Sequence, residues 1–150
     1  MADSKLDVTK ITMRHFELIG FNIHNAGSEL LDKDEVGGFR FVNTTNSAFN
    51  LEKNLAKVDL EIEIFTLDDE SEEDNGAGGK FKFEILFEIE NLVELAVEAE
   101  DETIEVEPLL DMTLTGLSYS TARGVILTRS LGTILEGVVL PIVNPANMGK

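Results

Sequence analysis

The stretch K-F-K-F-E-I-L-F-E-I-E, residues 80–90, alternates apolar with mostly charged side chains over its whole length. The apolar positions are Phe81, Phe83, Ile85, Phe87 and Ile89. A period of two places them on one face of a β-strand, because successive side chains of a strand point to opposite faces. The sequence therefore predicts a strand that buries this apolar face and turns a charged face to water.

A second alternating stretch lies upstream, in residues 58–64, where Val, Leu and Ile alternate with Asp59, Glu61 and Glu63. The segment between the two stretches, residues 68–79, is rich in Asp, Glu and Gly. This order predicts an antiparallel hairpin with a flexible acidic loop. We expect Lys80 and Lys82 to lie across from Glu61 or Glu63, where opposite charges on neighbouring strands attract.

Residues 11–23 are predicted to form another strand, in which the alternation slips twice. Gly20 lies near the second slip, as is typical of a β-bulge that redirects side chains. Residues 39–42 predict only a short extended piece, followed by a turn at residues 43–46. A weaker strand is expected at residues 91–97, continuing from the hairpin.

The last third of the chain predicts a helix that begins at Pro108 and continues to about residue 136, because leucine and valine recur there at near-helical spacing. Small residues fall at successive i+4 positions and would form one ridge: Gly116, Ser120, Gly124, Thr128 and Gly132. Such a ridge favours close packing, either on the sheet or on a second copy of the helix. The alternative is a helix broken at one of these glycines. Residues 138–145 are apolar and predicted to be extended.

The chain has 150 residues, of which 43% are hydrophobic and 27% charged, typical of one globular domain spanning residues 1–150. The absence of cysteine excludes disulfide frameworks, thiol catalysis and cysteine-type zinc sites. Residues 1–10 lack the apolar core of a secretory signal, and no uncharged stretch reaches the roughly 20 residues of a membrane span. We therefore expect a soluble, cytoplasmic protein without membrane insertion.

The net charge of −17 is concentrated in the middle of the chain, since residues 59–107 hold 19 acidic and 2 basic side chains. A surface of this sign repels the phosphate backbone, so nucleic acid is not expected as a partner. Two compatible interpretations of the acidic face remain. It is a solvated face that keeps the protein in solution, or it is a docking surface for a basic partner.

Motifs for catalysis and metal binding are missing from the sequence. His15 and His24 are its only histidines, and neither belongs to a zinc-protease pattern. The acidic segment, residues 68–79, does not have the ligand spacing of a calcium-binding loop. We expect no enzymatic activity, no cofactor and no metal site.

The stretch from Ser118 to Pro145, S-Y-S-T-A-R-G-V-I-L-T-R-S-L-G-T-I-L-E-G-V-V-L-P-I-V-N-P, resembles the SecB family of protein-export chaperones. That family has a helix with an aromatic–Ala–Arg element, then a Gly-Thr turn and a Leu-x-Pro-φ-Asn segment. The matching positions here are Ala122-Arg123, Gly132-Thr133 and Leu140–Asn144. The hairpin of residues 57–92 is similar to the family in order and pattern.

The resemblance implies an α+β fold, with a four-stranded antiparallel sheet and the long C-terminal helix packed on one face. It implies an ATP-independent chaperone, a holdase that binds unfolded preproteins in apolar grooves and passes them to the SecA motor of the export machinery. The assembly it implies is a homotetramer, built as a dimer of dimers. In that family the acidic outer face of the sheet receives a basic tail of SecA.

Two sets of residues are candidates for these contacts. Client binding is assigned to aromatic residues on irregular segments, Phe21, Phe39, Phe41 and Tyr119, for which ordinary core burial is the alternative. Partner docking is assigned to Glu84, which matches a family position implicated in docking. Glu61 and Glu63 are added to it from the charge pattern alone.

The chain also departs from the family. It ends at Lys150, where the family continues into a second helix, and it has Thr121 where the family has an aromatic. We therefore expect a C-terminally shortened SecB-like protein. The alternative function is an adaptor dedicated to one partner, such as the chaperone of a toxin–antitoxin module, which docks through the acidic sheet face.

Overall fold

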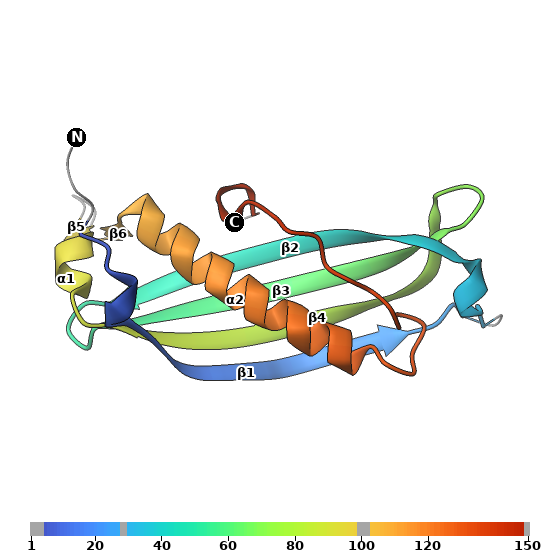
Figure 1. Cartoon of the computed structure of the whole chain (residues 1–150), viewed down its shortest axis with the longest axis horizontal. Coiled ribbons are helices and arrows are strands. Elements are labelled where there is room, and N and C mark those ends of the chain that lie inside the picture. Colours follow the sequence, from blue (N-terminus) through green and yellow to red (C-terminus); the bar gives the residue numbers. More distant parts are fainter. Residues whose placement is uncertain (1–4, 28–29, 99–102, 149–150) are drawn as a thin grey trace.

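The computed structural model describes residues 5–27, 30–98 and 103–148. Its longer elements are β1 (Ile11–His24), β2 (Val36–Asn50), β3 (Leu55–Asp68), β4 (Asp74–Ile89) and α2 (Pro108–Arg129). The shorter ones are η1 (Val8–Lys10), η2 (Lys33–Glu35), α1 (Leu92–Leu95), β5 (Ala96–Glu98), β6 (Ile104–Val106) and η3 (Pro145–Asn147). The long strands form one antiparallel sheet in the order β1-β4-β3-β2, and α2 crosses one face of it (Figure 1). The predicted α+β fold is confirmed.

The core lies between the two middle strands and α2. The five apolar residues of the stretch 80–90 are at most 1% exposed. On β3, every second residue from Ala56 to Ile64 is apolar and at most 2% exposed. From the helix, Leu110, Leu114, Ala122 and Ile126 pack onto this face. The ring of Phe83 lies 5.4 Å from that of Phe16 and 6.5 Å from that of Phe81, measured between centroids.

Both slips predicted in the first strand are confirmed as irregularities of pairing. The register of β1 against β4 shifts between Met13 and His15 and again between Leu18 and Gly20. Each shift leaves one residue of β1 without an opposite residue on β4. As a result, Leu18 lies opposite the buried Phe83, on the core side of the sheet.

The acidic loop is shorter than predicted, because β3 continues to Asp68 and β4 begins at Asp74. Gly78 and Gly79, expected in the loop, are strand residues. A Cβ atom would lie 2.3 Å from the Ile64 carbonyl oxygen at Gly78, and 2.8 Å from a methyl group of Leu135 at Gly79. These glycines therefore permit close packing within the strand. The expected cross-strand attraction is confirmed, with Lys80 Nζ 3.0 Å from Glu61 Oε1.

The prediction of only a short extended segment at residues 39–42 is wrong, since β2 covers 15 residues. The predicted turn at residues 43–46 is absent, and these residues pair with β3 without a break. Backbone pairing with a strand already fixed in the core outweighs the local turn preference of Asn and Thr. The strand predicted at residues 91–97 is also wrong in part, because α1 occupies its middle and only β5 is extended.

The predicted helix begins at Pro108 as expected but ends at Arg129, before residue 136. Gly132 follows with φ of +77°, a left-handed conformation that favours glycine and stops the helix. Within α2, the ridge residues Ser120, Gly124 and Thr128 are exposed, so the ridge faces away from the sheet. Among the described residues, no helix combines the length and apolar character needed to cross a bilayer.

Residues 138–148, here called the C-terminal segment, run back beside α2 on the side of β2 (Figure 1). Its residues 138–144 are extended, as predicted, and belong to no sheet. Val138, Leu140 and Met148 are buried in the core cluster. The segment therefore completes the helix layer over the part of the sheet that α2 leaves uncovered.

Replacement of Phe83 by Ala should lower the free energy of unfolding by about 3–5 kcal/mol, because a buried ring is lost and a cavity remains. Urea unfolding followed by circular dichroism measures the change. Lys82→Ala, at the neighbouring exposed position, is the control and should stay within about 0.5 kcal/mol of the wild type. Equal effects of the two changes would contradict the assignment of the core.

Candidate functional site

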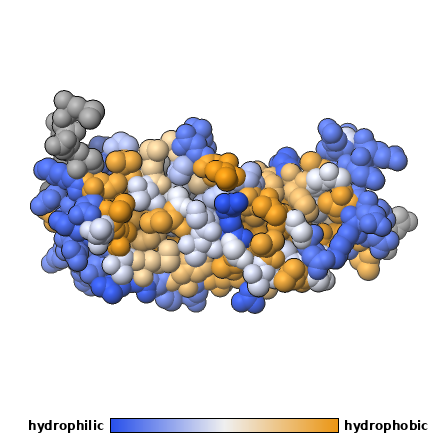
Figure 2. Space-filling model, viewed as in Figure 1, coloured by the Kyte–Doolittle hydropathy of each residue, from blue (hydrophilic) through white to orange (hydrophobic). Residues whose placement is uncertain are grey.

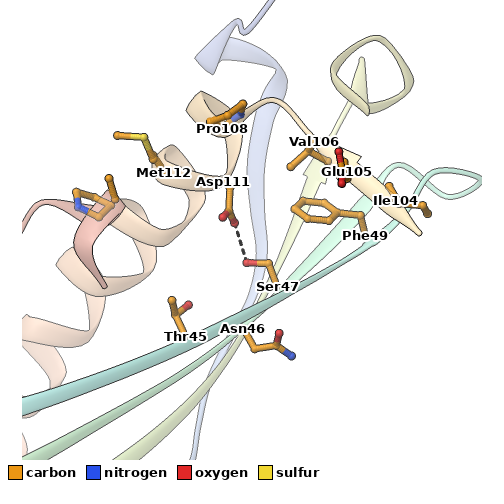
Figure 3. A pocket seen from close by; sticks show the side chains of 12 residues that line it. Thr45, Asn46, Ser47, Phe49, Ile104, Glu105, Val106, Pro108, Asp111 and Met112 are labelled. Atoms are coloured by element: carbon orange, nitrogen blue, oxygen red, sulfur yellow. Dashed lines mark hydrogen bonds between the residues drawn. The ribbon is translucent and has the colours of Figure 1, made fainter. Parts of the chain in front are cut away.

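A hollow of about 470 Å³ lies between β2, β6, the first turns of α2 and η3 (Figure 3). Its walls combine apolar residues, among them Phe49, Val106 and Met112, with polar ones, among them Asn46 and Glu105. At its centre the Ser47 hydroxyl donates a hydrogen bond of 3.0 Å to the Asp111 carboxylate. Such a hollow offers an apolar surface with a few fixed polar groups.

Two further hollows flank the C-terminal segment. One, of about 330 Å³, lies between α2 and the segment and is lined by Leu117, Tyr119 and Ile142 among others. The other, of about 500 Å³, lies between the segment and β2 and is lined by Phe41 and Met148 among others. The first and third hollows border β2. The second lies on the α2 side of the segment and shares Met112 and Pro145 with the first and Val143 with the third. Figure 2 shows apolar side chains on this face of the molecule. We call this region the α2–β2 groove.

The strand β2 forms one edge of the sheet and, within the described part of the chain, pairs only with β3. Its pairing has no irregularity from Gly38 to Asn50, and Arg40 is the one charged residue in that range. The other edge, β1, has two register shifts and two charged side chains, Arg14 and Glu17. Since bulges and charges protect an edge from pairing, β2 is the edge that remains open to another extended chain.

Two buried side-chain oxygens of β2, Asn43 Oδ1 and Thr45 Oγ1, have no hydrogen-bond partner in the described structure. The Thr45 side chain rises into the first hollow (Figure 3) and is 4% exposed. Its hydroxyl oxygen makes no hydrogen bond within the described structure. A buried hydroxyl that lacks a partner costs free energy, and a bound polar group would remove that cost.

Three of the four residues assigned to client binding lie on the helix-bearing side of the sheet near β2. Phe39 and Phe41 are half-buried on β2, with ring centroids 6.4 Å apart. Tyr119 is 4% exposed, and its hydroxyl donates a hydrogen bond of 2.7 Å to the Pro141 carbonyl. Its ring therefore belongs to the buried wall of the groove.

The fourth residue, Phe21, lies apart from the other three. It is on β1, the opposite edge of the sheet, and is 49% exposed. Its ring stacks on Phe81 at 5.8 Å between centroids, and the Arg129 guanidinium lies 5.7 Å from it. The strand order thus separates Phe21 from the α2–β2 groove.

The residues assigned to partner docking lie on the opposite face of the sheet. Glu61 and Glu63 are on β3, and Glu84 is on β4. The register also places Glu17, Glu84 and Asp59 directly opposite one another across β1, β4 and β3. We call these three residues the carboxylate row.

Like charges at directly opposite positions destabilise a sheet, so the carboxylate row carries a cost. Lys57 offsets part of it, since its Nζ lies 3.7 Å from Asp59 and 4.0 Å from Glu84. Glu17 and Asp59 were not assigned from the sequence. Their positions beside Glu84 depend on the register across three strands, which the sequence does not reveal. The alternation of β3 could have indicated only that the Asp59 side chain lies on the outer face of the sheet.

The members of the carboxylate row have neighbours of their own, since Lys57 lies beside Asp59 and Glu84, and His15 Nε2 lies 3.2 Å from Glu17 Oε2. Glu61 in turn is paired with Lys80. The same ion pair raises the pKa of Lys80 above its ordinary value. At the edge of this face, Arg14 binds Glu88 at 3.0 Å and lowers the pKa of that carboxyl. Among the residues that the structure describes, no three potential metal ligands of the His, Cys, Asp or Glu type lie together.

Ionisation of Tyr119 should report directly on the groove, since the chain has one tyrosine and no tryptophan. Burial raises the pKa of Tyr119, and the nearby charge of Arg123 opposes this only in part. A raised pKa means that the unfolded chain ionises first, so stability is lost as the pH rises above about 10. Near-ultraviolet absorbance should show phenolate formation at higher pH in the folded protein than in urea. Coincident titration curves would contradict the burial of this side chain.

Comparisons with known proteins support the fold. No family model matches the chain, and no curated protein is significantly similar to it in sequence. Among solved structures, it is similar to a SecB-like chaperone of Mycobacterium tuberculosis, which was determined in complex with a ChAD peptide from the HigA1 antitoxin. The sequence identity is 15% and the TM-score is 0.56, over 91% of this chain and 92% of that one. The chain therefore has a SecB-like fold.

Proposed function

We propose that this protein is a SecB-like chaperone that holds extended segments of unfolded polypeptides in the α2–β2 groove without ATP. The observation that carries the proposal is the unprotected edge of β2, which lies beside the apolar hollows of the groove. The similar structure from M. tuberculosis contains a bound peptide, which supports a polypeptide as the ligand. No reaction is required of such a protein, only binding and release.

Binding along β2 would combine two weak contributions. The backbone of the client pairs with the free edge, which spans about 40 Å over its regular part at roughly 3.3 Å per residue. Alternate side chains of the client then enter the hollows and bury apolar surface, worth about 25 cal/mol per Å². Because pairing of backbones is independent of sequence, the groove would accept many clients.

We propose that several such grooves act together in a homo-oligomer, a dimer of dimers. The outer face of α2 supports this assembly, because it joins the exposed small-residue ridge to exposed leucines and has no charged residue between Met112 and Ala122. These leucines are Leu109, Leu117, Leu127 and, just beyond the helix, Leu131. Several weak sites on one particle raise the overall affinity for a long unfolded chain.

The carboxylate row favours a second candidate function, docking of a basic partner on the outer face of the sheet. In the export pathway that partner would be the SecA motor, which receives the client. In a dedicated adaptor it would be one folded protein or peptide. The cost of the row is the supporting observation, since a docked cation would remove the repulsion among Glu17, Glu84 and Asp59.

The holdase function is tested by light scattering of an aggregation-prone protein diluted from denaturant, without nucleotide. The wild type should suppress aggregation in proportion to its concentration. The double variant Phe39→Ala/Phe41→Ala should lose most of this effect, because two half-buried rings of β2 are removed. Phe65→Ala is the matched control, a half-buried ring on the outer face below Arg40, and should remain active. Absence of suppression by the wild type at several-fold excess would refute a general chaperone.

Docking through the carboxylate row is tested with a fluorescein-labelled peptide rich in lysine and arginine. The double variant Asp59→Asn/Glu84→Gln should bind it several-fold more weakly at low salt, and the difference should vanish near 1 M salt. Glu70→Gln/Glu73→Gln removes the same charge at the β3–β4 turn and serves as the control. Equal loss in both variants would show a response to total charge, with no docking site.

A further inference from the structure

The α2–β2 groove already holds one polypeptide, the chain's own C-terminal segment. The segment lies between α2 and β2, with one hollow on its α2 side and another on its β2 side. Its residues 138–144 are extended and η3 (Pro145–Asn147) follows, and the backbone hydrogen bonds found for residues 139–148 lie within the segment. It thus follows the groove without being a strand of the sheet.

The groove holds this segment by its carbonyl groups. Arg123 donates from Nε to the Leu140 carbonyl at 3.1 Å, and Tyr119 donates to the carbonyl of Pro141 at 2.7 Å. Both donors are side chains of the buried and half-buried side of α2. Recognition through carbonyls needs no backbone N–H from the ligand, so proline is accepted.

The side chains of the segment are divided between groove and solvent. Val138 and Leu140 are buried, whereas Val139 lies outside and Ile142 is 88% exposed. Residues 137–149 contain no charged side chain, in a chain of which 27% is charged. The hollows on both sides show that the segment does not fill the groove.

We infer that the C-terminal segment occupies the groove in the free protein, and that a client binds by displacing this segment. The inference rests on the proposed function and adds the chemistry of the ligand. The groove takes an extended, uncharged segment with alternating apolar residues, in which proline is tolerated. Because the segment belongs to the same chain, it competes with clients for the groove at a high effective concentration. Only clients with several extended, uncharged, apolar stretches would then bind tightly.

A disulfide can lock the segment in place, because a Cβ atom at Gly116 would lie 3.3 Å from the Cγ atom of Pro145. The chain contains no cysteine, so Gly116→Cys/Pro145→Cys introduces a single pair of cysteines, and mass spectrometry verifies that the bridge forms within one chain. The same protein is then compared in its oxidised and reduced states. Gly116→Ser/Pro145→Ser, treated with the same oxidant, is the matched control without a bridge.

The probe is a fluorescein-labelled peptide with the sequence of residues 138–148, V-V-L-P-I-V-N-P-A-N-M. Fluorescence anisotropy should show binding to the reduced protein and to the serine control. The oxidised protein should bind about tenfold or more weakly, since its groove cannot open. Circular dichroism and the melting temperature verify that the locked protein is folded.

The outcomes separate the two proposals. Equal binding by oxidised and reduced protein, together with equal suppression of aggregation, would overturn the displacement of the segment and leave the holdase function intact. If the wild type and the oxidised and reduced cysteine variant all neither bind the peptide nor suppress aggregation, the proposed function and this inference are both overturned. Loss of binding only on oxidation supports the inference.

Discussion

One helix has to cover a sheet that is wider than itself, and the rest of the structure follows from this mismatch. An α-helix is about 10 Å across, while four strands at about 4.8 Å spacing span more than 14 Å between the outer strands. α2 covers the two middle strands, where the buried side chains of β3 and β4 are concentrated. The two edge strands, β2 and β1, are covered to different extents. The C-terminal segment lies beside β2, and the core side of β1 keeps half-exposed residues such as Phe21.

The middle of the sheet was predictable because its signals are local. Alternation alone identified the stretch 80–90 and its buried face, and the slips near Gly20 indicated the irregular pairing of β1. The full length of β2 was not predictable, since Asn43 and its neighbours are extended only through pairing with β3. The same holds for Gly78, where the carbonyl of Ile64, remote in sequence, requires a glycine within the strand.

The same distinction between local and long-range signals applies to the candidate site. Aromatic residues on irregular stretches pointed to Phe39 and Phe41, which do lie near the groove, and also to Phe21, which does not. The burial of Tyr119 could not be foreseen, because it depends on the path of the C-terminal segment across α2. The carboxylate row required the register of three strands, which no local pattern contains.

The regular, nearly uncharged edge of β2 is also a hazard for the protein that carries it, since two such edges can pair with each other. The net charge of −17 opposes such pairing, because two copies of the protein repel one another before their edges come into contact. An unfolded chain of neutral or positive charge meets no such barrier. If the edge of β2 binds clients as proposed, the negative charge would slow pairing between two β2 edges more than it slows the binding of an unfolded chain of neutral or positive charge.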